Sequence, residues 1–188
     1  MKPTLARATL VGMRCLAFLL IAVTACSRPH IQGISTIEEE DAPLASAIRA
    51  GDPAVDLQFA SGFYPAEQDG WRWTRGYFTA MLLAPPDAAA HGALLELRFD
   101  VPEVVINRLG PVTLSATISG IPLEPQTRSH PGIEPYRKPI PAKVFSKREV
   151  LVEFSLDKVI ESNSLPGEDR ELGVVVHAVA LLPNASTP

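Results

Sequence analysis

Strict alternation of apolar and polar residues along several segments constrains the fold of this 188-residue chain more than any other feature. In the segment 95–101, Leu95, Leu97, Phe99 and Val101 alternate with charged residues. Side chains two positions apart lie on one face of a β-strand, so this segment is predicted to be an antiparallel strand with one face in a core and the other in water. The same pattern occurs at 55–59, 112–119 and 150–157.

Two further segments, 77–84 and 172–182, are apolar on both faces, which is typical of strands that are covered on both sides. Proline and glycine separate these segments, as expected for turns. We therefore predict an all-β fold: a single antiparallel β-sandwich, jelly-roll-like, over residues 54–183, with a disordered tail at 184–188. The side chains expected to face inward are Val55, Leu57, Phe59, Leu95, Leu97, Phe99, Val112, Leu114, Ile118, Val152, Phe154, Val174 and Val176.

Six prolines fall between residues 122 and 141. Proline cannot donate a hydrogen bond to a neighbouring strand, so this segment is predicted to be an edge strand or a long irregular loop between the sheets. Long loops on a rigid scaffold often carry function, whereas a crossover that covers a sheet edge is purely structural.

The N-terminus carries the features of a secretion signal. Lys2, Arg7 and Arg14 precede a nine-residue apolar run at 15–23, which is too short to span a bilayer, since about 20 residues are needed. Val23-Thr24-Ala25-Cys26 resembles the lipobox of bacterial lipoproteins. This resemblance implies that residues 1–25 are a cleaved signal peptide and that Cys26 carries thioether-linked lipid, with palmitate as an expected acyl group; an uncleaved anchor is the alternative. Ser27 after the cysteine favours the outer membrane of the bacterial cell envelope.

Removing the signal makes the chain strongly acidic. The full chain has 17 Lys and Arg and 21 Asp and Glu, and residues 1–25 hold three of the basic residues and none of the acidic ones. The mature chain therefore has 14 basic and 21 acidic residues, a formal charge of −7. This charge argues against nucleic acid as a partner and against attraction to anionic headgroups, so the membrane is expected to hold the protein through acyl chains on Cys26.

Residues 26–53 are expected to form a flexible acidic tether, with the charge run Glu38-Glu39-Glu40-Asp41 as solvated chain. Within it, Leu44 to Ala50 is predicted to form two helical turns, because Leu44, Ala47 and Ile48 fall on one helical face.

Aromatic residues gather at the start of the predicted domain. Seven of the eleven Phe, Trp and Tyr residues of the mature chain lie between residues 59 and 78. Trp71 and Trp73 are two positions apart, so on a strand they share a face and could present a platform to the apolar face of a sugar ring. The alternative is that these tryptophans belong to the core, where aromatic side chains are common.

Three charged residues, Asp169-Arg170-Glu171, precede the last predicted strand. These charges either stabilise a turn only, or they bind the hydroxyl groups of a ligand through the several N–H donors of the Arg170 guanidinium.

Motifs at both ends of the predicted domain resemble a jelly-roll domain of bacterial envelope and glycosyltransferase-associated proteins: Gly62-Phe63-Tyr64, Glu67, Trp71-Arg72-Trp73-Thr74, and Asp169-Arg170-Glu171-Leu172-Gly173. The resemblance implies a sandwich similar to carbohydrate-binding modules. Together with the aromatic cluster it suggests a shallow sugar site formed by Tyr64, Trp71, Trp73, Asp169 and Arg170. Such a site requires the two ends of the domain to meet in space.

No catalytic or metal-binding motif is present in the sequence. The four histidines are far apart without metal-ligand spacing, and there is no Gly-x-Ser-x-Gly elbow or phosphate-binding glycine loop. We therefore expect a protein that is not an enzyme and uses no cofactor, with a spatially assembled hydrolase site as the alternative. Two functions remain: binding of envelope or exported polysaccharide, or docking onto an envelope protein assembly through the proline-rich edge.

Overall fold

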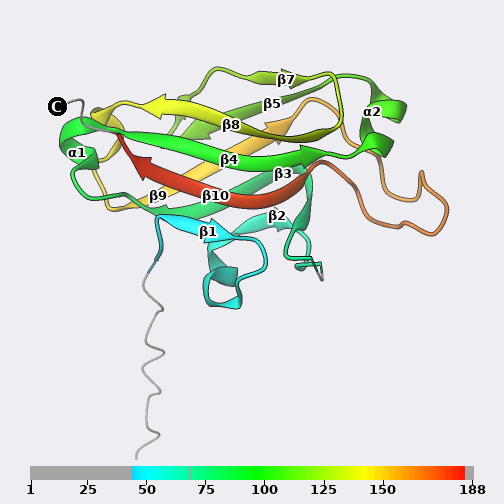
Figure 1. Cartoon of the computed structure of the whole chain (residues 1–188), viewed down its shortest axis with the longest axis horizontal. Coiled ribbons are helices and arrows are strands. Elements are labelled where there is room, and N and C mark those ends of the chain that lie inside the picture. The colour runs from blue at the N-terminus through cyan, green and yellow to red at the C-terminus, as the bar shows by residue number, and fades with distance from the viewer. Residues whose placement is uncertain (1–43, 68, 185–188) are drawn as a thin grey trace, which may run out of the picture. The chain divides into compact units, whose positions relative to one another are not determined.

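A computed structural model describes residues 44–67 and 69–184 (Figure 1). The expected signal peptide, the Cys26 lipidation site, the tether up to residue 43 and residues 185–188 of the tail lie outside the described residues. The strands are β1 Ala47–Arg49, β2 Ser61–Phe63, β3 Arg72–Leu83, β4 Ala93–Val101, β5 Val112–Ile118, β6 Ile121–Pro122, β7 Gln126–Arg128, β8 Gly132–Ile140, β9 Glu149–Leu156 and β10 Val175–Pro183. Short helices connect them: η1 Pro53–Gln58, α1 Ala88–His91, α2 Glu103–Leu109 and η2 Ala142–Val144.

The strands form two antiparallel sheets in jelly-roll order, which confirms the predicted all-β sandwich. One sheet runs β1-β10-β4-β8, and the other runs β3-β9-β5-β7, with β2 added beside β3 and β6 beside β5. Successive strands mostly alternate between the two sheets, which is the double Greek-key arrangement of a jelly roll. Figure 1 shows β8, β4, β10 and β1 in front of β5, β9 and β3.

Strand β3 connects the two sheets. Its first residues, Arg72 and Trp73, pair with Val176 and Val175 of β10, whereas Tyr77 to Leu83 pair with β9. Thr74 is fully buried at the crossing, where its hydroxyl accepts a hydrogen bond from the Val174 amide at 3.1 Å. This crossing places the entrance of the last strand beside the start of β3, so the two ends of the domain meet.

The core lies between the sheets and contains most of the predicted inward set. Residues of that set on β4, β5, β9 and the β10 segment are at most 1% exposed, and Phe78 and Phe154 stack with ring centroids 5.0 Å apart. The prediction is wrong for Leu57, which is 93% exposed, and Val55 is only half-buried. Both residues belong to η1 and not to a strand.

Two local predictions at the N-terminal edge of the domain are wrong. Residues 55–59 do not form a strand, because Asp52 caps a 3-10 helix by accepting from the Ala54 amide, and Pro53 favours its first turn. Residues 44–50 do not form a helix. Strand β1 lies there, Ile48 is 1% exposed, and the strand pairs with β10. The sandwich therefore starts before residue 54, within the segment predicted as tether.

The proline-rich segment contains an edge strand, as predicted. β8 pairs with β4 along its whole length and ends one sheet. Its Pro135 and Pro139 lie opposite Arg98 and Leu94. The missing proline N–H groups are tolerated at an edge because the strand needs only one set of ladder partners.

Within the described part of the chain, no helix has the length and apolar character needed to cross a membrane.

Candidate functional site

The structure brings Tyr64 and Arg170, two residues of the predicted sugar site, into contact. The Arg170 guanidinium carbon lies 5.3 Å from the centre of the Tyr64 ring, a distance suited to a cation–π interaction. Arg170 Nη1 also donates to Glu67 Oε1 at 3.2 Å, across 103 positions of sequence. Residues from both ends of the domain therefore form one cluster, which we call the Tyr64 cluster: Tyr64, Glu67, Arg75, Glu168 and Arg170.

Several N–H groups of Arg170 already donate to carboxylates, so fewer of them are left for the hydroxyl groups of a ligand. Its Nε and Nη2 donate to the two oxygens of Glu168, both at 2.8 Å, and its Nη1 donates to Glu67. This two-pronged geometry is the strong form of an arginine–carboxylate pair. Arg170 therefore holds Glu67 beside the Tyr64 ring.

The hydrogen bonds from Arg170 lower the pKa of Glu168 to about 2 from its ordinary 4.5. A carboxyl group whose pKa is lower in the folded than in the unfolded state stabilises the fold above the unfolded value and loses that contribution as the pH falls through the folded value. We therefore expect the Glu168–Arg170 pair to stay ionised in the folded protein until the pH approaches 2, and its contribution to stability to be lost as the pH falls from about 4.5 to about 2. Carboxyl NMR titration of Glu168 measures this directly. In an Arg170→Gln variant the Glu168 pKa should return toward 4.5; an unchanged low pKa in that variant would contradict the assignment.

Trp71 and Trp73 do not form a flat platform. Their ring centroids lie 6.4 Å apart with the planes at 81°, an edge-to-face contact. Both are half-buried, and Trp73 packs partly against the core. The two indoles are therefore neither a flat platform nor fully buried core residues. They contact each other, but a sugar ring could stack on only one of them at a time.

Asp169 is exposed and makes no side-chain hydrogen bond or ion pair with any residue of the described ranges 44–67 and 69–184. Two other residues join the cluster although sequence reasoning gave them no role. Glu168 forms the bidentate pair with Arg170, and the guanidinium carbon of Arg75 lies 5.4 Å from the centre of the Tyr64 ring. In the sequence, the charge pattern Glu-Asp-Arg-Glu at 168–171 is the feature that could have indicated a role for Glu168.

A groove of about 520 Å³ runs beside Tyr64. Phe63, Tyr64 and Pro65 line one part of it, and Asp56 and Arg72 of η1 and β3 line another. Arg72 is buried, donates from Nε to the Ala50 carbonyl at 2.8 Å and pairs with Asp56, so the wall formed by η1 is tied to the sheet. The volume falls within the range of small-molecule sites, which extends from about 300 to 1,000 Å³.

Several residues of the recognised motifs have structural roles. Gly62 has φ +75°, and a β-carbon there would meet the backbone of Tyr77. A β-carbon at Gly173 would lie 2.8 Å from the Arg75 carbonyl, so only glycine fits where β3 crosses between the sheets. Glu171 Oε1 accepts from the Gly76 amide at 2.7 Å. The motifs therefore include residues of the junction beside the Tyr64 cluster and three residues of the cluster itself, Tyr64, Glu67 and Arg170.

Among the described residues, no group of three His, Cys, Asp or Glu is placed to hold a metal ion. His177 lies at a bulge in β10, and its buried Nε2 has no hydrogen-bond partner in the described part of the chain.

The proline-rich edge exposes little apolar surface. Ile133 is 57% exposed, but Tyr136 and Ile140 on the same strand are at most 1% exposed. Tyr136 instead points inward and donates its hydroxyl hydrogen to the Glu124 carbonyl at 3.0 Å. An apolar docking patch along β8 would need several exposed residues together.

No family model and no curated protein sequence matches this chain.

Proposed function

We propose that this protein is an envelope lipoprotein, held in the membrane by lipid on Cys26, whose jelly-roll domain binds carbohydrate at the Tyr64 cluster. The observation that carries the proposal is the contact between the two ends of the domain, in which Arg170 holds the Tyr64 ring and Glu67 at the same place. A rigid aromatic ring beside fixed carboxylates suits a sugar, since the ring packs on apolar C–H faces and the carboxylates accept hydroxyl hydrogens.

The charges of the cluster favour neutral or amino sugars over uronic acids. Two carboxylates, Glu67 and Glu168, pair with the Arg170 guanidinium, and the exposed Asp169 follows Glu168 in the chain. A carboxylate on the ligand would be repelled here, because like charges that approach within a few ångströms raise the free energy of the complex.

Docking onto an envelope protein through β8 is the second candidate. The observation behind it is the outer edge of β8, which has no neighbouring strand among the described residues and which a partner strand could pair with.

Titration with oligosaccharides tests the first proposal. We expect a dissociation constant near 1 mM, about −4 kcal/mol, because an open site buries little surface. Binding should be followed through tryptophan fluorescence, with neutral, amino and uronic oligosaccharides compared. Tyr64→Ala should abolish the signal, whereas Tyr77→Ala, at an exposed tyrosine outside the cluster, should leave it unchanged. If no glycan perturbs the wild type, the carbohydrate proposal fails.

The lipid anchor predicts a separate result. Metabolic labelling with a clickable fatty acid should mark the wild-type protein and not Cys26→Ala, because the cysteine that ends the lipobox carries the thioether-linked lipid in this proposal. Equal labelling of the two proteins would rule out the anchor.

A further inference from the structure

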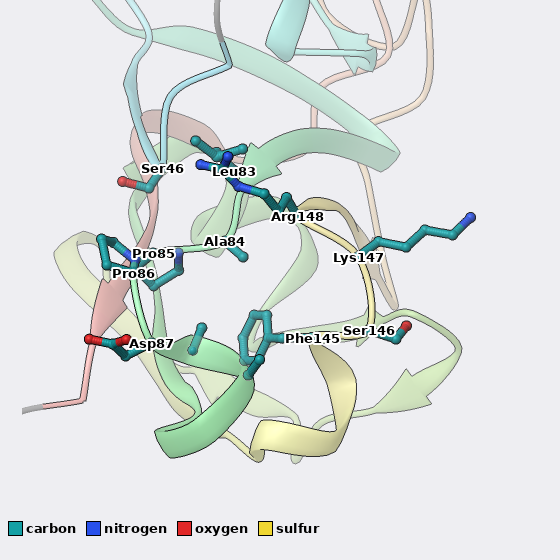
Figure 2. A pocket seen from close by; sticks show the side chains of 12 residues that line it. Ser46, Leu83, Ala84, Pro85, Pro86, Asp87, Phe145, Ser146, Lys147 and Arg148 are labelled. Carbon is teal, nitrogen blue, oxygen red and sulfur yellow. The ribbon is translucent and has the colours of Figure 1, made fainter.

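A recess at the end of the sandwich opposite α2 combines an apolar floor with a cationic rim (Figure 2). It has a volume of about 610 Å³ and is lined by the end of β3 and the loop into α1, by the loop between η2 and β9, and by Ser46 before β1. Pro85, Ala88 and Phe145 are buried and form its floor. None of these residues belongs to the Tyr64 cluster.

The walls of this recess are held in place without a ligand. The Ala84 amide donates to the Arg148 carbonyl at 2.6 Å, which ties the β3 end to the loop before β9. Pro85 and Pro86 restrict the backbone of one wall, and Asp87 beside them adopts the left-handed conformation at φ 60°. A site whose walls are already ordered loses little conformational entropy on binding.

Arg148 is the charged group best placed to bind a ligand. Figure 2 shows its side chain reaching across the rim toward Ser46 and Leu83, whereas the side chain of Lys147 extends away from the recess. Within residues 44–67 and 69–184, neither Arg148 nor Lys147 forms an ion pair. A guanidinium without a carboxylate partner keeps all its donors for an anion.

We propose that this recess binds an anionic amphiphile, a molecule with a phosphate, sulfonate or carboxylate group on an apolar body. The anionic group would accept hydrogen bonds from Arg148 and the Ser46 hydroxyl, and the apolar part would cover the floor at Pro85, Ala88 and Phe145. Asp87 lies on the wall away from Arg148 in Figure 2, which leaves one end of the recess cationic. The cationic end of the recess therefore contrasts with the net negative charge of the chain as a whole.

The probe is 8-anilinonaphthalene-1-sulfonate, whose fluorescence rises in an apolar site, with dodecyl phosphate below its micelle concentration as competitor. Arg148→Gln should weaken the binding of both about fivefold to tenfold, because a charge-assisted contact is lost. Lys147→Gln removes the same net charge from the same loop but should change binding less than twofold, as should Arg49→Gln at an exposed position on β1. Asp87→Asn should not weaken binding, and asparagine tolerates the left-handed backbone there.

The Arg148→Gln protein should keep its fold, because the hydrogen bond to Ala84 involves only the Arg148 backbone. Circular dichroism checks this. Equal binding by the wild type and Arg148→Gln would overturn the proposal. So would displacement of the probe by inorganic phosphate as effective as that by dodecyl phosphate, because the apolar floor would then have no part. The anionic amphiphile could be a membrane lipid or a soluble molecule, and cosedimentation with phosphatidylglycerol vesicles, compared with phosphatidylcholine vesicles, separates the two. Arg148-dependent binding to the anionic vesicles identifies a membrane lipid. Binding of the monomeric amphiphile alone identifies a soluble ligand. Absence of binding in both arms would also overturn it.

Discussion

Replacing Phe99 by alanine is expected to lower the free energy of unfolding by about 3–5 kcal/mol. Phe99 is 1% exposed on β4, between its ladder partners Glu134 of β8 and Val176 of β10. The cost combines lost burial with the cavity that a rigid sandwich cannot fill. The guanidinium carbon of the buried Arg128 lies 5.7 Å from the centre of the Phe99 ring, so the change also removes a cation–π partner.

Urea denaturation of the wild type and the variant, followed by tryptophan fluorescence, measures this cost. A domain of this size has a total stability of about 5–15 kcal/mol, so Phe99→Ala is expected to leave it close to unfolding. Ile133→Ala is the matched control, because Ile133 is an apolar residue on a neighbouring strand but is 57% exposed; its cost should stay below about 0.5 kcal/mol. A cost for Phe99→Ala below about 1 kcal/mol would show that the ring is not in the core.

Replacing Arg72 by alanine is expected to cost about 3 kcal/mol, because three interactions are lost from a buried position. Its Nε donates to the Ala50 carbonyl, its Nη2 pairs with Asp56, and its guanidinium carbon lies 4.7 Å from the centre of the Phe59 ring. The Asp56 carboxylate is 57% exposed and contributes little, so most of the cost comes from the unsatisfied Ala50 carbonyl and the lost packing on Phe59.

Arg72→Met separates these contributions. Methionine keeps an apolar stem beside Phe59, so this variant should cost about 1 kcal/mol less than Arg72→Ala. Both variants should raise hydrogen–deuterium exchange in η1, because Arg72 ties that helix to β3. The exposed Arg49→Ala serves as control and should affect stability by less than about 0.5 kcal/mol. Stability of Arg72→Ala equal to that of the control would show that η1 is held by other contacts.

Long alternating segments were sufficient to predict the strands of the core. Leu95, Leu97 and Phe99 each repeat the pattern on β4, and only a strand places all of them on one face. The shorter segment 55–59 shows the same alternation, but a proline and a capping aspartate before it favour a 3-10 helix. A three-residue pattern such as β1 carries too little periodicity to be distinguished from a helical turn, and its strand conformation comes from pairing with β10.

The sequence by itself determined the strand pattern, the acidic surface and the residue types of the candidate site. Only the tertiary structure decided which of them meet: Glu67 and Arg170 are separated by 103 positions, and they touch because β3 crosses between the sheets beside the entrance to β10. Only the structure shows that Trp71 and Trp73 lie edge to face and that Arg170 donates three hydrogen bonds to the carboxylates of Glu67 and Glu168. The physical reason is that periodicity records which face of a strand is buried, whereas the orientation of a ring or guanidinium depends on neighbours that only folding supplies.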